Sequence, residues 1–340
     1  MKRCITGVLL LLTVLLSVTA QEREYVIVVH GGAGAMRGLE NRPDIQAHYY
    51  AALDSALHIG DSILAAGGEG PLAVRASGEG PLAVRAVIRY FESNPLFNAG
   101  IGATVSATGC FELDAALMEG KDLSAGSVTG VQHVKHPIDA AYQVKEHSVH
   151  VMLSGSGADE FAREQGLEMV EDNLYFATPR TMQWVEKFKQ ESKKNGTVGC
   201  VVLDRQGNLT AGTSTGGMLQ KKWGRIGDSP VIGAGTYADN RSCAVSCTGH
   251  GEYFIRHAVA FDVCARHRYL QESVQQAADA VIHGELSREE GNGGLIAVDK
   301  EGQIGISFNS EGMFHGYLYK EKGQSQPVQK MGIFPEKKQE

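Results

Sequence analysis

A threonine at the start of an apolar run is the residue in this sequence that is best placed to do chemistry. Thr197 follows Gly196 and precedes Val198. A cut between Gly196 and Thr197 makes Thr197 the first residue of a new chain and frees its α-amino group. The reference pKa of such an amine is about 7.7–8.0, so an appreciable fraction is neutral near pH 7. A threonine hydroxyl beside such a base is a covalent nucleophile. The sequence therefore suggests a self-cleavage site, although an ordinary strand start explains Gly-Thr alone.

Two motifs after Thr197 contain groups that such a nucleophile needs. The segment 212–217 reads Gly-Thr-Ser-Thr-Gly-Gly, and a strand returning beside the first brings the Thr215 hydroxyl close to Thr197. Arg225 and Asp228 lie three residues apart in a loop rich in Gly and Pro. A guanidinium binds a carboxylate with two hydrogen bonds, and a carboxylate pairs with an ammonium. This pair therefore suits the α-carboxylate and α-amino groups of an amino acid, whereas a solvated ion pair is the simpler alternative.

A third motif, Cys-Thr-Gly-His-Gly-Glu at 247–252, indicates a strand that turns into a helix. Backbone N–H groups point outward at such a turn. The Thr248 hydroxyl and the Gly249 N–H then suit an oxyanion hole, the site that stabilises a tetrahedral acyl intermediate. A plain turn capped by Thr248 is the alternative. His250 does not suggest a Ser-His-Asp triad, because the G-x-S-x-G letters at 212–216 are interpreted as the end of a strand and not as the strand-to-helix turn of a nucleophile elbow.

Length and charge limit the class of protein. A chain of 340 residues with a net charge of −7 is long enough for a sizeable core. No basic run is long enough to suggest nucleic-acid binding. Lys2 and Arg3 precede an apolar run at 7–16 and small residues up to Ala20, which is the layout of a secretory signal. We therefore expect a signal peptide at 1–20, export to a periplasm, and no membrane attachment after its removal.

Five cysteines follow the predicted signal: Cys110, Cys200, Cys243, Cys247 and Cys264. An odd number rules out complete pairing within one chain. Cys243 and Cys247 lie in one predicted strand, where four residues span about 13 Å, too far for a disulfide. They are interpreted as small buried apolar residues.

Predicted strands and helices fall in blocks on each side of residue 197, without strict alternation, which favours antiparallel sheets with helices outside them. Strands are predicted at 25–30, 104–117 (two), 148–153, 197–203, 209–213, 231–236, 242–247, 294–298 and 304–309. Helices are predicted at 43–66, 137–145, 158–165 and within 251–283 (two). The glycine-rich stretch 31–34 is expected to be a turn, and the charged stretch from about 179 to 196 a flexible linker. The segment 68–76 is repeated unchanged at 78–86, with one copy expected to begin a helix that ends at Glu92.

The motifs together resemble the plant-type L-asparaginase / isoaspartyl peptidase family of N-terminal-nucleophile hydrolases. The matching stretches are VVHGGAGA at 28–35, NPLFNAGIGA at 94–103, GTVGCVVLD at 196–204, GTSTGG at 212–217, GRIGDSPVIGAGTYA at 224–238 and CTGHGE at 247–252. They span most of the chain after the predicted signal.

The resemblance implies a four-layer αββα sandwich of the α+β class, with two antiparallel sheets between helical layers. It implies cleavage before Thr197 into chains 21–196 and 197–340, and a dimer of two-chain protomers. Thr197 would be the nucleophile and Thr215 its hydroxyl neighbour, with the oxyanion hole at Thr248 and Gly249. The remaining site residues would bind the substrate or support Thr197: Arg225, Asp228, Gly251 and Asn98. Backbone carbonyls would hold a structural sodium ion: those of Phe91, Glu92, Asn94, Phe97, Ala99 and Ile101.

The expected activity is hydrolysis of β-linked isoaspartyl dipeptides and L-asparagine to aspartate through a Thr197 acyl-enzyme, with no cofactor in the chemistry. Two alternatives stay open. A glycosylasparaginase acts on glycoasparagine, and a binding protein of this fold never cleaves itself. A dinucleotide site at the glycines near Gly100 is disfavoured, because no ribose-binding acidic residue follows in a βαβ frame.

Overall fold

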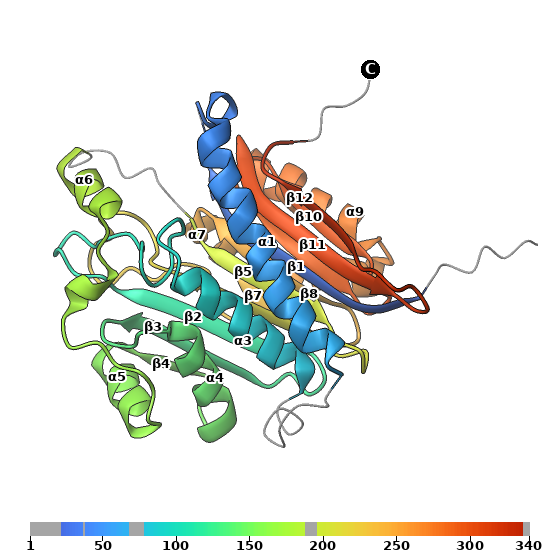
Figure 1. The fold of residues 1–340 in the computed structure, drawn as a ribbon, viewed down its shortest axis with the longest axis horizontal. Helices are drawn as coiled ribbons and strands as arrows, with labels where there is room; N and C mark the ends of the chain where they lie inside the picture. The colour runs from blue at the N-terminus through green and yellow to red at the C-terminus, as the bar shows by residue number, and fades with distance from the viewer. Residues whose placement is uncertain (1–21, 37, 68–77, 188–195, 336–340) are drawn as a thin grey trace, which may run out of the picture.

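Two β-sheets pack face to face between two layers of helices in the computed structural model (Figure 1). The structure describes residues 22–36, 38–67, 78–187 and 196–335. The predicted signal peptide and the first copy of the duplicated segment lie outside the described residues. The four-layer α+β sandwich expected from the sequence is confirmed.

The larger sheet has eight strands in the order β12-β11-β1-β5-β6-β2-β3-β4. Its strands are β1 (Arg23–Gly34), β2 (Leu113–Glu119), β3 (Ala125–Val131), β4 (Met152–Ser154), β5 (Val198–Leu203), β6 (Leu209–Thr215), β11 (Gly312–Glu321) and β12 (Val328–Gly332). All neighbours are antiparallel except the edge strand β4, which pairs parallel with β3. The expectation of two purely antiparallel sheets was therefore wrong at this edge.

The smaller sheet has the order β10-β9-β8-β7 and is antiparallel throughout. Its strands are β7 (Thr236–Ala238), β8 (Cys243–Gly249), β9 (Gly293–Asp299) and β10 (Ile304–Phe308). Helices α7 (Gly251–Arg256), α8 (Val259–Ala265) and α9 (Val274–Asp279) belong to its outer layer, together with the π-helical turns Arg266–Leu270 and Ala280–Leu286.

The outer face of the larger sheet is covered by α1 (Pro43–Ala65), α3 (Glu79–Glu92) and α4 (Pro137–His147). Helix α5 (Gly155–Glu164) packs on β3 and β4 at the edge of this sheet, and the same half of the chain contains α6 (Pro179–Lys187) and the 3-10 turns Leu39–Asn41 and Asn173–Phe176. The second copy of the duplicated segment opens α3, as expected, with Pro81 in its first turn, where a missing N–H costs nothing.

Burial on both faces explains the continuous apolar runs of the central strands. In β1, Val26 and Val28 pack with Ile296 and Val298 of the smaller sheet. Ile27 and Val29, which point the other way because side chains alternate along a strand, pack in the cluster that includes Leu53 of α1. The sandwich thus places the start of β5 between two cores.

Several boundaries differ from the expectations. The stretch 31–34 continues β1 through a register shift between His30 and Gly32 and is not a turn. The expected linker begins with helix α6, whereas residues 188–195 lie outside the described part. One strand, β2, replaces the two expected within 104–117. The strands expected at 231–236 and 148–153 are each replaced by a three-residue strand that lies further along the chain, β7 and β4. Strands β3, β11 and β12 had no counterpart in the expected list.

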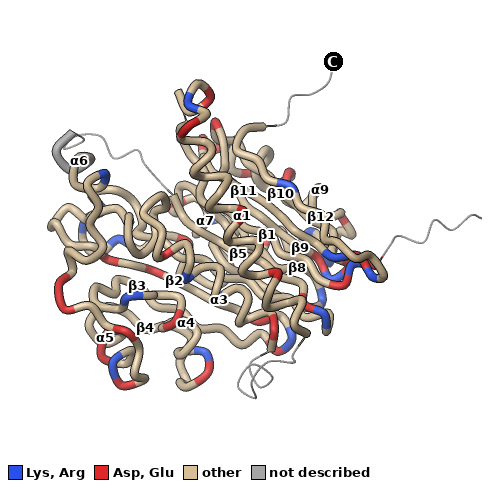
Figure 2. The backbone as a smooth tube through the Cα atoms, viewed as in Figure 1, with Lys and Arg blue, Asp and Glu red and all other residues tan. Residues whose placement is uncertain are grey.

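Charge is mixed over the backbone. Figure 2 shows lysines and arginines interspersed with aspartates and glutamates, without a continuous basic stretch in that view. Across the described segments, no helix combines the length and the hydropathy that a membrane crossing requires.

Candidate active site

Thr197 lies where strands of both sheets end together. It directly precedes β5, and the β5–β6 register, which pairs Val198 with Ser214, places it beside Thr215 at the end of β6. The Thr197 hydroxyl donates to Thr215 Oγ1 at 3.3 Å, and both side chains are buried. The predicted neighbourhood of the two threonines is therefore present.

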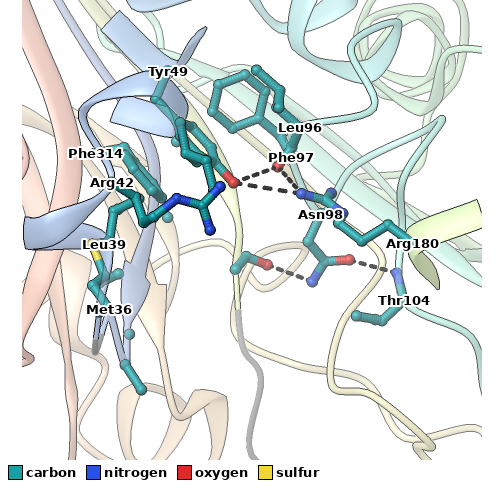
Figure 3. A pocket seen from close by; sticks show the side chains of 18 residues that line it. Met36, Leu39, Arg42, Tyr49, Leu96, Phe97, Asn98, Thr104, Arg180 and Phe314 are labelled. Carbon is teal, nitrogen blue, oxygen red and sulfur yellow. Dashed lines mark hydrogen bonds between the residues drawn. The ribbon is translucent and has the colours of Figure 1, made fainter. Parts of the chain in front are cut away.

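The bond between Gly196 and Thr197 is held at its carbonyl. Gly196 O accepts hydrogen bonds from Asn98 Nδ2 at 2.6 Å and from Thr215 Oγ1 at 3.0 Å. Asn98 is fixed in turn, because its Oδ1 accepts from the Thr104 amide at 2.7 Å (Figure 3). Two donors on one carbonyl oxygen match the arrangement that stabilises negative charge on that oxygen when a nucleophile attacks the carbon.

The glycine-rich end of β1 packs directly against the Gly196–Thr197 bond. A Cβ atom on Gly32 would lie 3.1 Å from both Gly196 Cα and Thr197 N, and Gly32 has a φ of +106°. Both the space and the backbone conformation therefore require glycine here. The motif at 31–34 therefore serves close packing against the Gly196–Thr197 bond.

The buried side chain of His30 contacts the backbone carbonyl of Thr197. His30 Nδ1 lies 3.0 Å from Thr197 O, and its Nε2 lies 3.0 Å from Ser246 Oγ. A carbonyl only accepts, so Nδ1 carries the proton and Nε2 accepts from Ser246. Burial lowers the pKa of His30 to about 3, so the ring is neutral. The network continues from Ser246 to Thr213 at 2.7 Å and from Thr213 to Thr236 at 2.6 Å.

Arg225 and Asp228 face the small pocket that Thr197 lines. Arg225 Nε and Nη2 donate to the two oxygens of Glu252 at 2.9 and 3.0 Å, and this pairing lowers the Glu252 pKa. Asp228 is buried, and its Oδ2 has no hydrogen-bond partner among the described residues. Burial raises the pKa of Asp228 to about 7. The oxygen of Asp228 that has no partner in the described part of the chain is therefore available to bind the cationic group of a ligand.

Gly251 and Gly249 complete this pocket. A Cβ on Gly251 would lie 2.8 Å from Arg225 Nη2 and from Asp228 Oδ1, so any side chain there would fill the space between the two charged groups. Gly249 lines the pocket, and the neighbouring Thr248 Oγ1 accepts from the Ala33 amide at 3.2 Å, which leaves its hydroxyl proton available for donation. All the predicted catalytic and substrate residues thus gather around Thr197.

The pocket at Thr197 is nearly closed, and a larger cavity lies across the scissile bond. The first has a volume of about 10 Å³, roughly the room for one water. The second, of about 540 Å³, is lined by the end of β1, by Arg42 and Tyr49 of the α1 region, and by Phe97 (Figure 3). Gly196 lines both. Gly196 therefore lies at the boundary of the two spaces.

The comparisons with known proteins agree with this geometry. A family model described as asparaginase matches residues 23–327. The chain belongs to the asparaginase family. It is 43% identical over 308 residues to an isoaspartyl peptidase of Salmonella typhimurium, covering 86% of this chain and 95% of that protein. It is 42% identical to the isoaspartyl peptidase of Escherichia coli, covering 89% and 99%. It is 39% identical to the isoaspartyl peptidase/L-asparaginase of Mus musculus, covering 85% and 86%.

Three residues of this asparaginase-family site had no role in the sequence interpretation: His30, Gly32 and Glu252. All three lie inside motifs that the resemblance rested on, at 28–35 and 247–252. A histidine followed by glycines at the end of an apolar strand was the available signal for a buried histidine with close backbone packing. Nothing in the spacing of Arg225 and Glu252, 27 residues apart, indicates their pairing.

Proposed function

We propose that this chain cleaves itself before Thr197 and then hydrolyses the β-amide of L-asparagine and of isoaspartyl dipeptides, releasing aspartate. The observation that carries the proposal is the scissile carbonyl of Gly196, held by Asn98 and Thr215 beside the Thr197 hydroxyl. The relatives' names and the family membership support the substrate class.

In maturation, Thr197 Oγ attacks the Gly196 carbonyl carbon while Asn98 and Thr215 stabilise the oxygen. The hydroxyl proton passes by way of Thr215 Oγ1 to the Thr197 nitrogen, the C–N bond breaks, and that nitrogen leaves as an amine. Water then hydrolyses the resulting ester. This releases Gly196 with a free carboxylate and gives Thr197 its free α-amino group, the base for later turnovers.

In turnover, the departure of Gly196 joins the small pocket to the larger cavity. The substrate α-ammonium pairs with Asp228 and the α-carboxylate with Arg225, which exchanges Glu252 for the substrate. Thr197 attacks the β-carbonyl carbon, and Thr248 and Gly249 stabilise the oxyanion. Ammonia or an amino acid leaves toward the larger cavity, which has room for an amino acid. Water hydrolyses the β-aspartyl ester.

A substrate panel tests this proposal. Cleaved enzyme is incubated with L-asparagine, a β-aspartyl dipeptide, the matching α-aspartyl dipeptide and glycoasparagine, and free aspartate is measured. We expect aspartate from the first two only, since the α-linked isomer presents the wrong carbonyl to Thr197. Turnover of glycoasparagine alone supports a glycosylasparaginase instead, and no turnover by fully cleaved chains contradicts the proposal.

We also propose a structural sodium ion in the loop after α3, held by the carbonyls of Phe91, Glu92, Asn94, Phe97, Ala99 and Ile101. Two of these oxygens crowd glycines: Cβ atoms would lie 2.2 Å from Glu92 O at Gly100 and 2.7 Å from Phe97 O at Gly102. A tight loop of carbonyl oxygens suits a hard cation, which would hold Asn98 in place. Unfolding temperatures that are equal in sodium and choline chloride would contradict this.

Export and assembly complete the proposal. The charged and apolar pattern of residues 2–20 supports release to a periplasm, and N-terminal sequencing of exported protein should begin at Gln21. Family resemblance supports a dimer of two-chain protomers, which sedimentation of the cleaved protein tests; a two-chain monomer at micromolar concentration would contradict it.

A further inference from the structure

Two buried cysteines from different layers of the sandwich meet at the far end of β8. Cys243 is the first residue of β8, and Cys264 lies on α8, the helix that packs on that strand. Their Sγ atoms are 2.7 Å apart, and the two side chains are at most 3% exposed. A disulfide bond is about 2.05 Å long, so only a small side-chain adjustment separates the two thiols from bonding distance.

The backbone around this pair is already tied together. Ser242 Oγ donates to Cys264 O at 2.6 Å, and the Cys264 thiol donates to Cys243 O at 3.2 Å. The second of these hydrogen bonds is lost when the thiol proton leaves, whereas the bond from Ser242 does not involve a thiol and still joins the strand to the helix beside the sulfur atoms. Cys243 and Cys264 are therefore held close together independently of a bond between them.

We propose that Cys243 and Cys264 form a disulfide bond in the exported protein. The bond closes a loop of residues 243–264 that includes Thr248, Gly249, Gly251 and Glu252. It links the oxyanion-hole strand to the helical layer behind it. This proposal rests on the predicted export for its oxidising compartment and does not depend on the proposed activity.

The chemistry is a thiol–disulfide exchange with an oxidised dithiol protein or a small-molecule disulfide. One cysteine thiolate attacks the donor disulfide, giving a mixed disulfide and one donor thiol. The second cysteine then displaces the other donor thiol and completes the bond, so two electrons and two protons pass to the donor. Burial raises the pKa of Cys264 well above its ordinary value, so the exchange takes place while the segment is still exposed during folding.

The other three cysteines after the predicted signal serve as internal controls. Cys200 and Cys247 also follow Thr197 and are also buried, and Cys110 precedes it. Cys247 shares the strand and the apolar cluster of Cys243, four residues further along. A Cys247→Ser variant therefore makes a similar change in the same core without touching the proposed bond.

The test delivers residues 21–340 to a bacterial periplasm with a host leader, so that it does not depend on the native signal. The purified protein is denatured in N-ethylmaleimide and digested, and the labels on the four cysteines that follow Thr197 are counted by mass spectrometry before and after reduction. We expect two labels before reduction, four after it, and a cross-linked peptide pair containing Cys243 and Cys264. Four labels before reduction, or protection of a different pair, overturns the proposal.

Two variants give a second readout. Their labels are counted and their unfolding temperatures are measured on the unreduced protein. Cys243→Ser should carry three labels and unfold several degrees lower than wild type, because the closed loop is lost. Cys247→Ser should carry one label and keep the protected pair. If reduction lowers the unfolding temperature of the Cys243→Ser protein as much as that of wild type, the stabilisation does not come from this bond and the proposal fails. Should Cys243→Ser not fold, the labelling of wild type and of Cys247→Ser still decides.

Discussion

At the scale of single residues, the site differs from an ordinary strand start by the hydrogen bonds on one carbonyl. Asn98 and Thr215 both donate to Gly196 O, and Asn98 is itself held by the Thr104 amide. In an ordinary loop this oxygen would bond to water or to one amide. Here the donors are in place before the reaction, so no reorganisation is needed when charge develops.

Asn98→Asp tests this role with a side chain of the same shape. The carboxylate cannot donate, and its charge opposes an oxyanion, so we predict that self-cleavage slows by about 10²- to 10³-fold. The appearance of two chains over time, followed by gel electrophoresis or mass spectrometry, measures the rate. Cleavage at the wild-type rate would remove Asn98 from the mechanism.

Asp228 predicts a pH dependence that separates two substrates. Its pKa of about 7 means that it is neutral below pH 7 and charged above, and only the charged form pairs with an ammonium. The value of kcat/KM for L-asparagine should therefore rise with pH and level off above about 7. The α-amine of Thr197 titrates in the same pH range, and its titration affects kcat/KM for every substrate.

Succinamic acid supplies the control, because it is asparagine without the α-amino group. Its pH profile should show the rise caused by the Thr197 amine but lack the rise caused by Asp228. The ratio of kcat/KM for L-asparagine to kcat/KM for succinamic acid therefore isolates the titration of Asp228. A ratio that does not change between pH 5 and 8 would show that Asp228 does not bind the α-amino group.

At the scale of elements, the nucleophile is positioned by a network that joins the two sheets. Hydroxyls of Thr213 in β6, Thr236 in β7 and Ser246 in β8 lead to His30 in β1, which contacts the Thr197 carbonyl. All these groups are buried. Because a buried polar group without a partner is costly, each member of the network fixes its neighbours.

His30→Leu should therefore lower the free energy of unfolding by about 1–3 kcal/mol, since it removes the donor to the Thr197 carbonyl and the acceptor of the Ser246 hydroxyl proton. Measured in a Thr197→Ala background, the effect refers to one intact chain. In His30→Asn, the side-chain Nδ2 can replace Nδ1 as donor to the carbonyl, so this variant should recover part of the lost free energy of unfolding. In the chain that keeps Thr197, His30→Asn should also cleave itself faster than His30→Leu. Equal values for the two variants would mean that His30 only fills space.

The elements that the sequence predicted best are those with an unambiguous local pattern. Helix α1 runs from Pro43 to Ala65, with a proline at its start and glycines after its end. Strands β5 and β6 form a hairpin whose turn is evident in the sequence. The strand β12 could not be found this way, because its residues Val328–Gly332 are partly exposed and carry no alternation. The helix α6 was missed because its charged sequence was taken for a linker, although Arg180 anchors it to the carbonyls of Pro95 and Leu96.

The residues of the candidate site could be selected from the sequence, for a physical reason. The chemistry of the site depends on a few residue types in short motifs, and those motifs are visible in the sequence. The contacts between motifs are not visible: Asn98 reaches Gly196 across 98 positions, and Arg225 finds Glu252 through the packing of a loop on α7. Such pairings follow from sheet order and register, which the sequence alone did not fix.

At the scale of the whole molecule, the uncut chain blocks its own substrate pocket. The pocket at Thr197 holds about 10 Å³, and Gly196 stands between it and the cavity of about 540 Å³. Asparagine cannot occupy the first space until Gly196 leaves. In the proposed mechanism, self-cleavage would therefore do two things at once: it would free the α-amino base and it would open the site.

Intact mass spectrometry of the wild-type protein beside a Thr197→Ala variant tests this account most directly. We predict two chains in the wild type, the second beginning at Thr197, and aspartate release that grows in step with cleavage. The variant should remain one chain and be inactive. A wild-type chain that stays whole and still hydrolyses asparagine, or a variant that cleaves at the same bond, would contradict the assignment of Thr197 as the nucleophile.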